Sequence, residues 1–446
     1  MNNQRHHIIQ FVCILLVLWA IMLQGFTKAV KMTPLKGYTD EKEKVEMNFK
    51  TYLDGSYQDY LTEHAKRNTG FREFFIRNYN QVCYSCFNKI TNNNVVKGRN
   101  QELYLKMYLD EITGKRLLYY FSDIEQAKAK AREDVEATLR LIDTLHSHGT
   151  DFLFVFAPTK TAVYPEYMPR KYQATVSDFS LQAYYLQLFK ENNIPLIDFL
   201  SYFQSIKNEF PYPLYTRTGT HWAESTIPMV ADSIYRKLEE VTGYRLPSID
   251  YIDPNPTSDY SVQDGELEDQ MNLLFPLRKP ALPRPVFTLK DTIGTDRPNL
   301  LVIGDSYFVQ LRISSFVNAF NHWDYWVYNR DVQSSRKAYN WKQLANLIDA
   351  PKVLEDADIV LAIFTAPCFY PFMYDFQKSA LDLYRRLNDT EEDIIQMKMQ
   401  QIKDNQRWYD AVVKQAEERG LSVEENLRRN AIYVIKSERK KQTDTE

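Results

Sequence analysis

The stretch "LLVIGDSYF", residues 300–308, predicts both a fold class and the place of a reactive group. Its continuous apolar run is typical of a buried strand, and Gly304 allows a tight turn at the end of that strand. Ser306 then precedes a predicted helix. Open parallel sheets bind ligands at the carboxyl ends of their strands. We therefore expect the Ser306 hydroxyl at that edge, near backbone N–H groups suited to stabilising an oxyanion.

Further apolar runs alternate with helical patterns on both sides of this stretch. Such alternation predicts an α/β fold with a mainly parallel sheet and helices on both faces. A long helix is expected after Ser122 and Glu125, which have the spacing of a capping box, and Gly149 suits its end. The other predicted strands are "DFLFVFAP" (151–158), "IPLIDF" (194–199), "DYWVYN" (324–329) and "DIVLAIF" (358–364).

Near its N-terminus, after Arg5, the chain of 446 residues has an uncharged apolar run, "IIQFVCILLVLWAIMLQGF", residues 8–26. This run is just long enough to span a bilayer. It lacks a convincing small-x-small cleavage site, so we favour an uncleaved membrane anchor over a cleaved signal peptide. The remainder of the chain is then expected outside the cytoplasm.

The pattern along the chain predicts four regions. Within the α/β region, residues 244–298 are Pro-rich and are expected to form an irregular connection, of the kind that is often functional. The last region is charged and helical. The four are a membrane anchor or signal segment (1–30), a helical region with a hairpin (31–120), the α/β domain (121–387) and a helical tail (388–446).

Composition argues against several classes of function. An apolar share of 44% and a charged share of 25% are those of a globular protein. A net charge of -3 without a long basic face gives no case for nucleic acid, and a Gly-rich phosphate loop is missing from the sequence. Cys83 and Cys86 form a CxxC without the partners of a zinc site. We expect them to lie one helical turn apart as small buried groups, with a redox role as the minor alternative, and we expect neither metal nor cofactor.

A second candidate group lies upstream, in "YTRTGTHWAE", residues 215–224. His221 would act as the base for Ser306 if the two segments meet at the edge of the sheet. A catalytic histidine normally has a carboxylate that orients its ring, but Gly219 occupies the position two residues earlier. Displaced carboxylates without supporting spacing are Glu224, Asp305, Asp198 and Asp264.

Four other side chains have both a functional and a structural interpretation. Lys160 and Tyr164, in "APTKTAVYPEYMP" (157–169), either line the cleft or support the turn after a strand. Trp222 is favoured as a packing residue over a platform for a sugar ring. Arg330 either contacts substrate or forms a surface salt bridge.

Taken in order, these segments resemble the AlgJ/AlgX-like family of SGNH-hydrolase-fold proteins of alginate and exopolysaccharide O-acetylation. The resemblance covers roughly residues 57–370. It is carried by the Thr-His-Trp and Gly-Asp-Ser segments and by Pro-x-Lys followed by Tyr-Pro-Glu. Further similar segments are "YLTEHAKRNTGFREFFIRNYN" (60–80), "VVKGRNQELYL" (95–105) and "DGELEDQMNLLFP" (264–276).

The resemblance implies a single-pass protein of the inner membrane whose bulk transfers acetyl groups to polysaccharide hydroxyls outside the cytoplasm. A membrane-bound O-acyltransferase would supply the acetyl group. Ser306 would be the nucleophile and His221 its base, whereas the family's aspartate aligns with Gly219. Two alternatives stay open: a catalytically impaired subunit that binds polysaccharide or holds an acetylation complex together, and a carbohydrate esterase. All three share one fold, which by itself does not decide the reaction.

Overall fold

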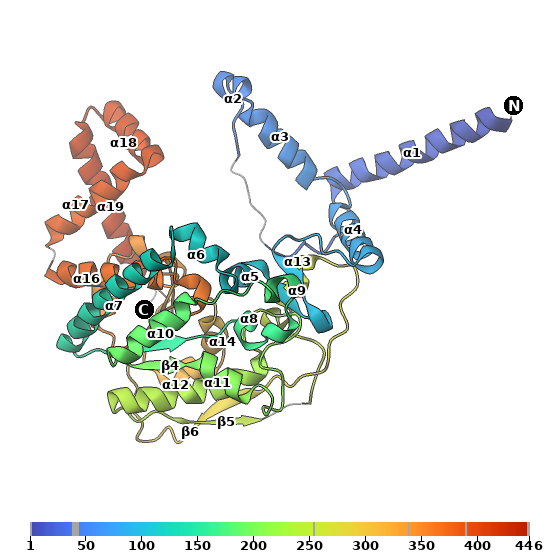
Figure 1. The fold of residues 1–446 in the computed structure, drawn as a ribbon. Helices are drawn as coiled ribbons and strands as arrows, with labels where there is room; N and C mark the ends of the chain where they lie inside the picture. The colour runs from blue at the N-terminus through green and yellow to red at the C-terminus, as the bar shows by residue number, and fades with distance from the viewer. Residues whose placement is uncertain (1, 38–43, 253–254, 338, 389, 444–446) are drawn as a thin grey trace. The chain divides into compact units, whose positions relative to one another are not determined.

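The computed structural model describes residues 2–37, 44–252, 255–337, 339–388 and 390–443. Its elements are shown in Figure 1. The chain divides into two compact units that are interleaved in sequence. Unit 1 comprises Met1–Lys106, Arg217–Thr220 and Tyr260–Pro280, and unit 2 comprises Met107–Thr216, His221–Asp259 and Ala281–Glu446.

Unit 1 is mainly helical. A break near Asn68 separates two of its helices, and the predicted hairpin is the antiparallel pair β1–β2. Both cysteines of the CxxC lie in one helix, α4, but only Cys83 is buried, so the expectation that Cys86 is buried too is wrong. The elements are α1 (Asn2–Thr27), α2 (Phe49–Leu53), α3 (Ser56–Arg67), α4 (Arg72–Phe87), β1 (Val95–Lys97), β2 (Leu103–Leu105) and α13 (Val262–Met271).

Helix α1 contains a segment, Arg5–Thr27, that is long and apolar enough to cross a membrane, with a mean hydropathy of 2.3. Its C-terminal end packs closely on the turn between α3 and α4. A Cβ atom on Gly25 would lie 2.7 Å from the Asn68 carbonyl oxygen, and one on Gly70 would lie 2.8 Å from the Gly25 nitrogen. Only glycine fits at both positions, because the two backbones touch.

Unit 2 contains a seven-stranded sheet in the order β10-β9-β8-β7-β11-β3-β4. Neighbouring strands from β8 to β4 are parallel, which confirms the predicted mainly parallel sheet. The antiparallel strands β9 and β10 at one edge escaped prediction because they are too short to show a pattern. The strands are β3 (Asp151–Phe156), β4 (Leu196–Asp198), β7 (Leu300–Gly304), β8 (Trp323–Val327), β9 (Asp331–Ser334), β10 (Lys342–Gln343) and β11 (Ile359–Phe364).

Helices cover both faces of this sheet because its strands are apolar on both sides. Side chains such as Phe154, Ile303 and Ala362 pack with α7, α10, α15 and α16 in one large core, and α11 and α12 contact β3 elsewhere. The covering helices are α7 (Ile124–Ser147), α10 (Leu181–Glu191), α11 (Phe199–Ile206), α12 (Ile227–Thr242), α14 (Phe308–Ile313), α15 (Ala350–Glu355) and α16 (Phe376–Arg385).

The start of α7 differs from the prediction by one residue. Asp123, not Ser122, is its N-cap and accepts a hydrogen bond from the Gln126 N–H at 2.8 Å. The Ser122 hydroxyl instead bonds to the Asp123 carboxylate at 3.1 Å, and Gln126 takes the place expected for Glu125 by accepting from the Ser122 N–H. A carboxylate accepts more strongly than a hydroxyl, which favours this register.

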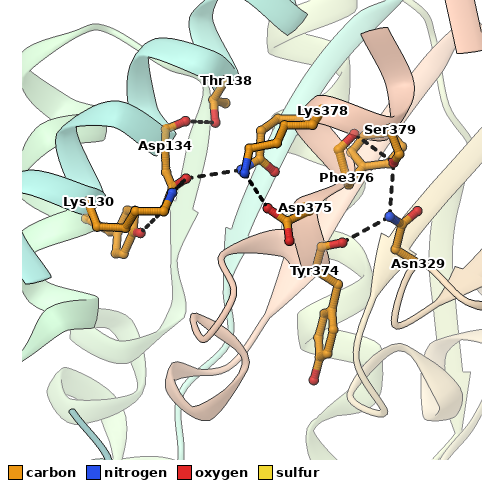
Figure 2. A network of polar contacts seen from close by, with 11 residues as sticks. Lys130, Asp134, Thr138, Asn329, Tyr374, Asp375, Phe376, Lys378 and Ser379 are labelled. Carbon is orange, nitrogen blue, oxygen red and sulfur yellow. Dashed lines mark hydrogen bonds and ion pairs between the residues drawn. The ribbon is translucent and has the colours of Figure 1, made fainter. Parts of the chain in front are cut away.

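A buried carboxylate links three of the covering helices. Asp134 of α7 forms an ion pair with Lys130, and Figure 2 shows this pair facing α16. The Tyr185 hydroxyl of α10 donates to Asp134 at 2.9 Å, and the Gln377 amide of α16 approaches it at 3.4 Å. Buried charges are retained where they are paired and hydrogen-bonded, so this network fixes α7, α10 and α16 together.

The connection at residues 244–298 is more regular than expected. Its segments in unit 2 form an antiparallel ribbon, β5 (Ser248–Ile252) with β6 (Val286–Lys290), which packs near α12 (Figure 1). The ribbon's Tyr251 lies directly opposite Phe287. Other short helices of unit 2 are α5 (Lys106–Ile112), whose first residue belongs to unit 1, α6 (Lys115–Tyr120), α8 (Lys160–Val163) and α9 (Arg170–Gln173).

The tail forms a bundle of three helices, α17 (Glu391–Asp404), α18 (Gln406–Arg419) and α19 (Val423–Thr443), seen as the red helices in Figure 1. Ile402, Val412 and Leu427 lie in its separate apolar core. The bundle contacts the rest of unit 2 through Ile348 and through the Gln401 amide, which donates to the Ala345 carbonyl at 2.9 Å.

Candidate functional site

Ser306 lies in the turn between β7 and α14, at the carboxyl edge of the sheet. β7 is a central strand, flanked by β8 and β11. A Cβ atom on Gly304 would lie 2.6 Å from the Ile363 Cγ2 atom and 2.7 Å from the Ile363 carbonyl oxygen. Because β11 passes so close, only glycine allows the chain to leave β7 along this path.

The structure brings His221 to Ser306, as the sequence predicts. The His221 Nε2 atom lies 2.7 Å from the Ser306 Oγ atom, and both residues are half-buried. The His221 ring also packs on the ring of Tyr307, with centroids 4.8 Å apart. This distance is within the reach required of a general base.

Packing and main-chain contacts hold the segment that carries His221. Trp222 is fully buried, and its ring contacts those of Phe199, Phe203 and Tyr307. The sequence favoured this packing role over a sugar platform. The Ala223 N–H donates to the Leu214 carbonyl at 2.8 Å and so closes the segment into a loop.

Lys160 and Tyr164 support the same loop. The buried Lys160 ammonium donates to the Thr216 carbonyl at 2.6 Å. The Tyr164 hydroxyl accepts from the Leu214 N–H at 3.2 Å. Of the two interpretations left open by the sequence, these contacts fit the structural one.

Asp305 fixes the serine turn from the other side. Its buried carboxylate accepts from the Thr365 N–H at 2.8 Å, from the Thr365 hydroxyl at 2.7 Å and from the Tyr307 N–H at 3.0 Å. Thr365 directly follows β11. These bonds tie the ends of β7 and β11 together.

The other carboxylates considered for His221 make the following contacts. Asp198 caps α11 by accepting from the Ser201 N–H at 3.0 Å, and the Glu224 carboxylate binds the Arg284 guanidinium at 2.9 Å. Asp264 is buried in α13 and belongs to unit 1. Arg330 is exposed and pairs with Asp331 at 2.8 Å, which fits a surface salt bridge.

Tyr328 is a further site residue that sequence reasoning missed. It directly follows β8, the neighbour of β7, and its phenol lies close enough to Ser306 for that residue to affect its ionisation. Burial raises the pKa of the Tyr328 phenol, while Ser306 acts in the opposite direction. The phenol therefore keeps its proton near neutral pH and can donate it to a hydrogen bond. Its place near the end of the predicted strand "DYWVYN" was the available signal.

The backbone at Tyr328 is held in the left-handed region, at φ 52°. The ring of Tyr374 packs against that of Tyr328 with centroids 5.2 Å apart. As Figure 2 shows, the neighbouring Asn329 amide donates to the Tyr374 carbonyl and to the Ser379 hydroxyl, both at 3.0 Å. These contacts fix the loop that carries the Tyr328 hydroxyl.

Groups of three or more His, Cys, Asp or Glu side chains able to hold a metal ion do not occur among the residues that the structure describes.

Comparison with known proteins finds similarity over part of the chain. Residues 115–308 match the model of the SGNH hydrolase-like domain of the acetyltransferase AlgX. A comparison with curated proteins gives no match. Three solved structures are similar in fold. The O-acetyltransferase domain of Pseudomonas putida AlgJ is 18% identical, with 65% of this chain and 98% of that domain covered and a TM-score of 0.41.

The second, Pseudomonas aeruginosa AlgX, is 16% identical, with 65% of this chain and 66% of that chain covered and a TM-score of 0.43. The third, Bacillus cereus PatB1, is 10% identical, with 56% and 93% covered and a TM-score of 0.35. The matched segment runs from α6 to the start of α14 and includes both His221 and Ser306. This segment is similar to the SGNH hydrolase-like domain of AlgX-type acetyltransferases.

Proposed function

We propose that this protein is an O-acetyltransferase that transfers acetyl groups to hydroxyls of a cell-surface or secreted polysaccharide. The observation that carries the proposal is the 2.7 Å contact between the His221 Nε2 and Ser306 Oγ atoms, within the segment that matches an acetyltransferase domain. A histidine within hydrogen-bonding reach of a serine hydroxyl is the arrangement that activates a serine nucleophile.

In the first half of the reaction, the Ser306 Oγ atom attacks the carbonyl carbon of the acetyl donor, and His221 takes the hydroxyl proton. A tetrahedral intermediate with a negatively charged oxygen forms. When it collapses, the bond to the donor breaks, and His221 gives its proton to the leaving oxygen. Ser306 is left as an acetyl ester.

In the second half, a sugar hydroxyl attacks the acetyl carbon and His221 takes the proton from that hydroxyl. Collapse of the second intermediate breaks the bond to the Ser306 oxygen, which recovers its proton from His221. The products are the O-acetylated sugar and the free enzyme. Water in place of the sugar would give the esterase reaction, so access of the acceptor decides between the two activities.

Tyr328 is suited to stabilise the charged oxygen of both intermediates. Its protonated hydroxyl lies near Ser306, in a partly buried site where a hydrogen bond to a developing charge has a larger effect than in water. The donor is held in place before the reaction begins, which is the requirement for such stabilisation.

The proposed location is the inner membrane, with α1 as a single-pass anchor and the rest of both units in the periplasm. The apolar segment Arg5–Thr27 supports this placement. A membrane-bound O-acyltransferase would then bring the acetyl group across the bilayer, since an acetyl donor made in the cytoplasm has to reach a periplasmic site.

A second candidate function is that of a binding or scaffold subunit of an acetylation complex. The observation that favours it is Gly219, which stands two residues before His221, at the position where the resemblance implies an aspartate. Glycine has no side chain with which to orient the imidazole. In the serine protease that serves as the reference case, loss of the orienting carboxylate lowers kcat by about 10⁴-fold.

The test is acetylation of the detergent-solubilised full chain by a chromogenic acetyl donor, followed by intact-mass measurement. We expect a mass increase of one acetyl group that Ser306→Ala abolishes. Ser233→Ala, which changes a half-buried serine of α12, is the matched control and should retain the increase. An acetyl-enzyme that survives Ser306→Ala contradicts the proposed nucleophile. Saccharide binding without any acetyl-enzyme would favour the scaffold function instead.

A further inference from the structure

A cavity of about 530 Å³ lies beside the candidate site and is not used by the reaction described above. Its walls come from α14 and the turn after it, from β6 of the ribbon, and from the start of α12. All of these segments belong to unit 2. The connection at residues 244–298, which the sequence marked as a functional segment, thus supplies one wall.

The cavity is connected to the reacting groups through two short stretches of chain. Gln310 lies four residues after Ser306, about 6 Å further along the direction of α14. Glu224 lies three residues after His221. Ser306 and His221 themselves are not among the lining residues. The cavity is therefore a neighbouring subsite, at the distance expected for part of a substrate that extends beyond its reacting hydroxyl.

The Gln310 side chain is the evidence that this cavity binds a ligand. It lines the cavity and is only 3% exposed, and within the described residues neither atom of its carboxamide has a hydrogen-bond partner. Buried carboxamides are normally hydrogen-bonded, since the interior of the protein does not replace their contacts with water. A carboxamide supplies both donors and an acceptor, which matches the vicinal hydroxyls of a sugar.

The charged residues that line the cavity indicate which class of ligand it can bind. Glu224 and Arg284 are the charged residues among those that line the cavity, and they pair with each other at 2.9 Å. The site thus has no net charge, whereas a uronate carboxylate is bound best by a cation that is not already neutralised. The remaining walls combine hydroxyl and amide groups with apolar surface, including the half-exposed Ile313 and the more exposed Val286. Such surface suits the apolar face of a pyranose ring.

We propose that this cavity binds an uncharged glycosyl unit of the acceptor polysaccharide, next to the unit that is acetylated. The Gln310 carboxamide and the Glu224–Arg284 pair hydrogen-bond to its hydroxyls, and the balanced charge selects neutral sugars over uronates. The inference rests on the proposed function, because it assigns the cavity to the acceptor of that reaction.

Binding measured on the Ser306→Ala full chain in detergent tests the inference without any need for acetyl transfer. The probes are a neutral hexose oligomer, such as a hexasaccharide of glucose or mannose, and an oligouronate of the same length, both titrated by calorimetry. We expect tighter binding of one of the neutral probes. Gln310→Met, which conserves volume, should raise its Kd by about tenfold, as expected for the loss of a good hydrogen bond. Gln333→Met changes another buried glutamine, in β9, and is the matched control.

A second binding experiment changes the charge of the cavity. Glu224→Gln leaves Arg284 without its carboxylate and should shift binding at least about tenfold toward the oligouronate, and this readout remains if Gln310→Met fails to fold. Tighter binding of the oligouronate by the starting protein, equal effects of the two glutamine variants, or no binding of any probe overturns the inference. Absence of an acetyl-enzyme in the parent chain would instead contradict the proposed function, so the two failures are separable.

Discussion

At the scale of single residues, the serine hydroxyl has two polar neighbours from different segments. His221 approaches it from the loop after Thr216, and Tyr328 approaches it from the end of β8. The first contact was predictable, because a Gly-Asp-Ser turn after an apolar strand and a Thr-His-Trp segment are local patterns. The second was not, because the sequence does not show that β8 lies next to β7.

Tyr328→Phe tests the proposed oxyanion contact. Removal of one donor of this kind typically lowers kcat by about 10²-fold to 10³-fold, and we expect a loss of that order with little change in the KM for the acetyl donor. The phenylalanine ring keeps the packing on Tyr374. Steady-state kinetics with a chromogenic donor give both constants.

Tyr339→Phe, which removes a half-buried hydroxyl elsewhere in unit 2, should leave kcat unchanged. Equal rates for Tyr328→Phe and the parent protein would exclude Tyr328 as an oxyanion donor.

At the scale of elements, the strands predicted from long apolar runs are confirmed. Strands without such a run, which are recognised only by their pairing with another strand, were missed. β3, β7 and β11 are buried along nearly their whole length and read directly from the sequence. β5 and β6 are half-exposed and lie far apart in the chain, so the sequence of neither strand predicts which strand it pairs with. The cavity beside β6 was for that reason out of reach of sequence analysis.

The Asp134 network gives a prediction about how α7, α10 and α16 hold together. Asp134→Ala would leave the Tyr185 hydroxyl and the Lys130 ammonium without their shared acceptor. Breaking a buried pair costs about 3–5 kcal/mol, and Lys130 is partly exposed, so we expect a loss near the lower limit of that range. Urea unfolding followed by fluorescence measures the change.

Asp143→Ala removes an exposed carboxylate of the same helix and serves as the control. Asp134 bonds to Lys130, Tyr185 and Gln377 and not to Ser306, so kcat at low temperature should be unaffected in both variants. A loss of stability no larger than that of the control would contradict the role given to Asp134.

At the scale of the whole molecule, one buried carboxyl group makes stability depend on pH. Burial raises the pKa of Glu111 from its ordinary value of 4.5 to about 7, against the smaller opposite effects of the Tyr370 hydroxyl and of Arg116. Between these two values the folded protein holds a proton that the unfolded chain has released. Stability should therefore fall as pH rises through this window, by roughly 3 kcal/mol in total, and stay constant above it.

Glu111→Gln should remove this dependence, because an amide does not titrate. The measurement is the free energy of unfolding in urea at pH 5 and at pH 8 for the parent, for Glu111→Gln and for Glu136→Gln, whose carboxylate is exposed on α7. The difference between the two pH values should shrink only in Glu111→Gln. The same pH difference in all three proteins would show that Glu111 ionises normally in the fold.

The glycine contact between α1 and the turn at Asn68 has a mechanical consequence. Because Gly25 and Gly70 bring the two backbones together, the apolar helix α1 is tightly joined to the turn between α3 and α4. If α1 is the proposed membrane anchor, a tilt of this helix in the lipid would turn α3 and α4 with it. Lipid composition and bilayer thickness would then affect the orientation of these two helices.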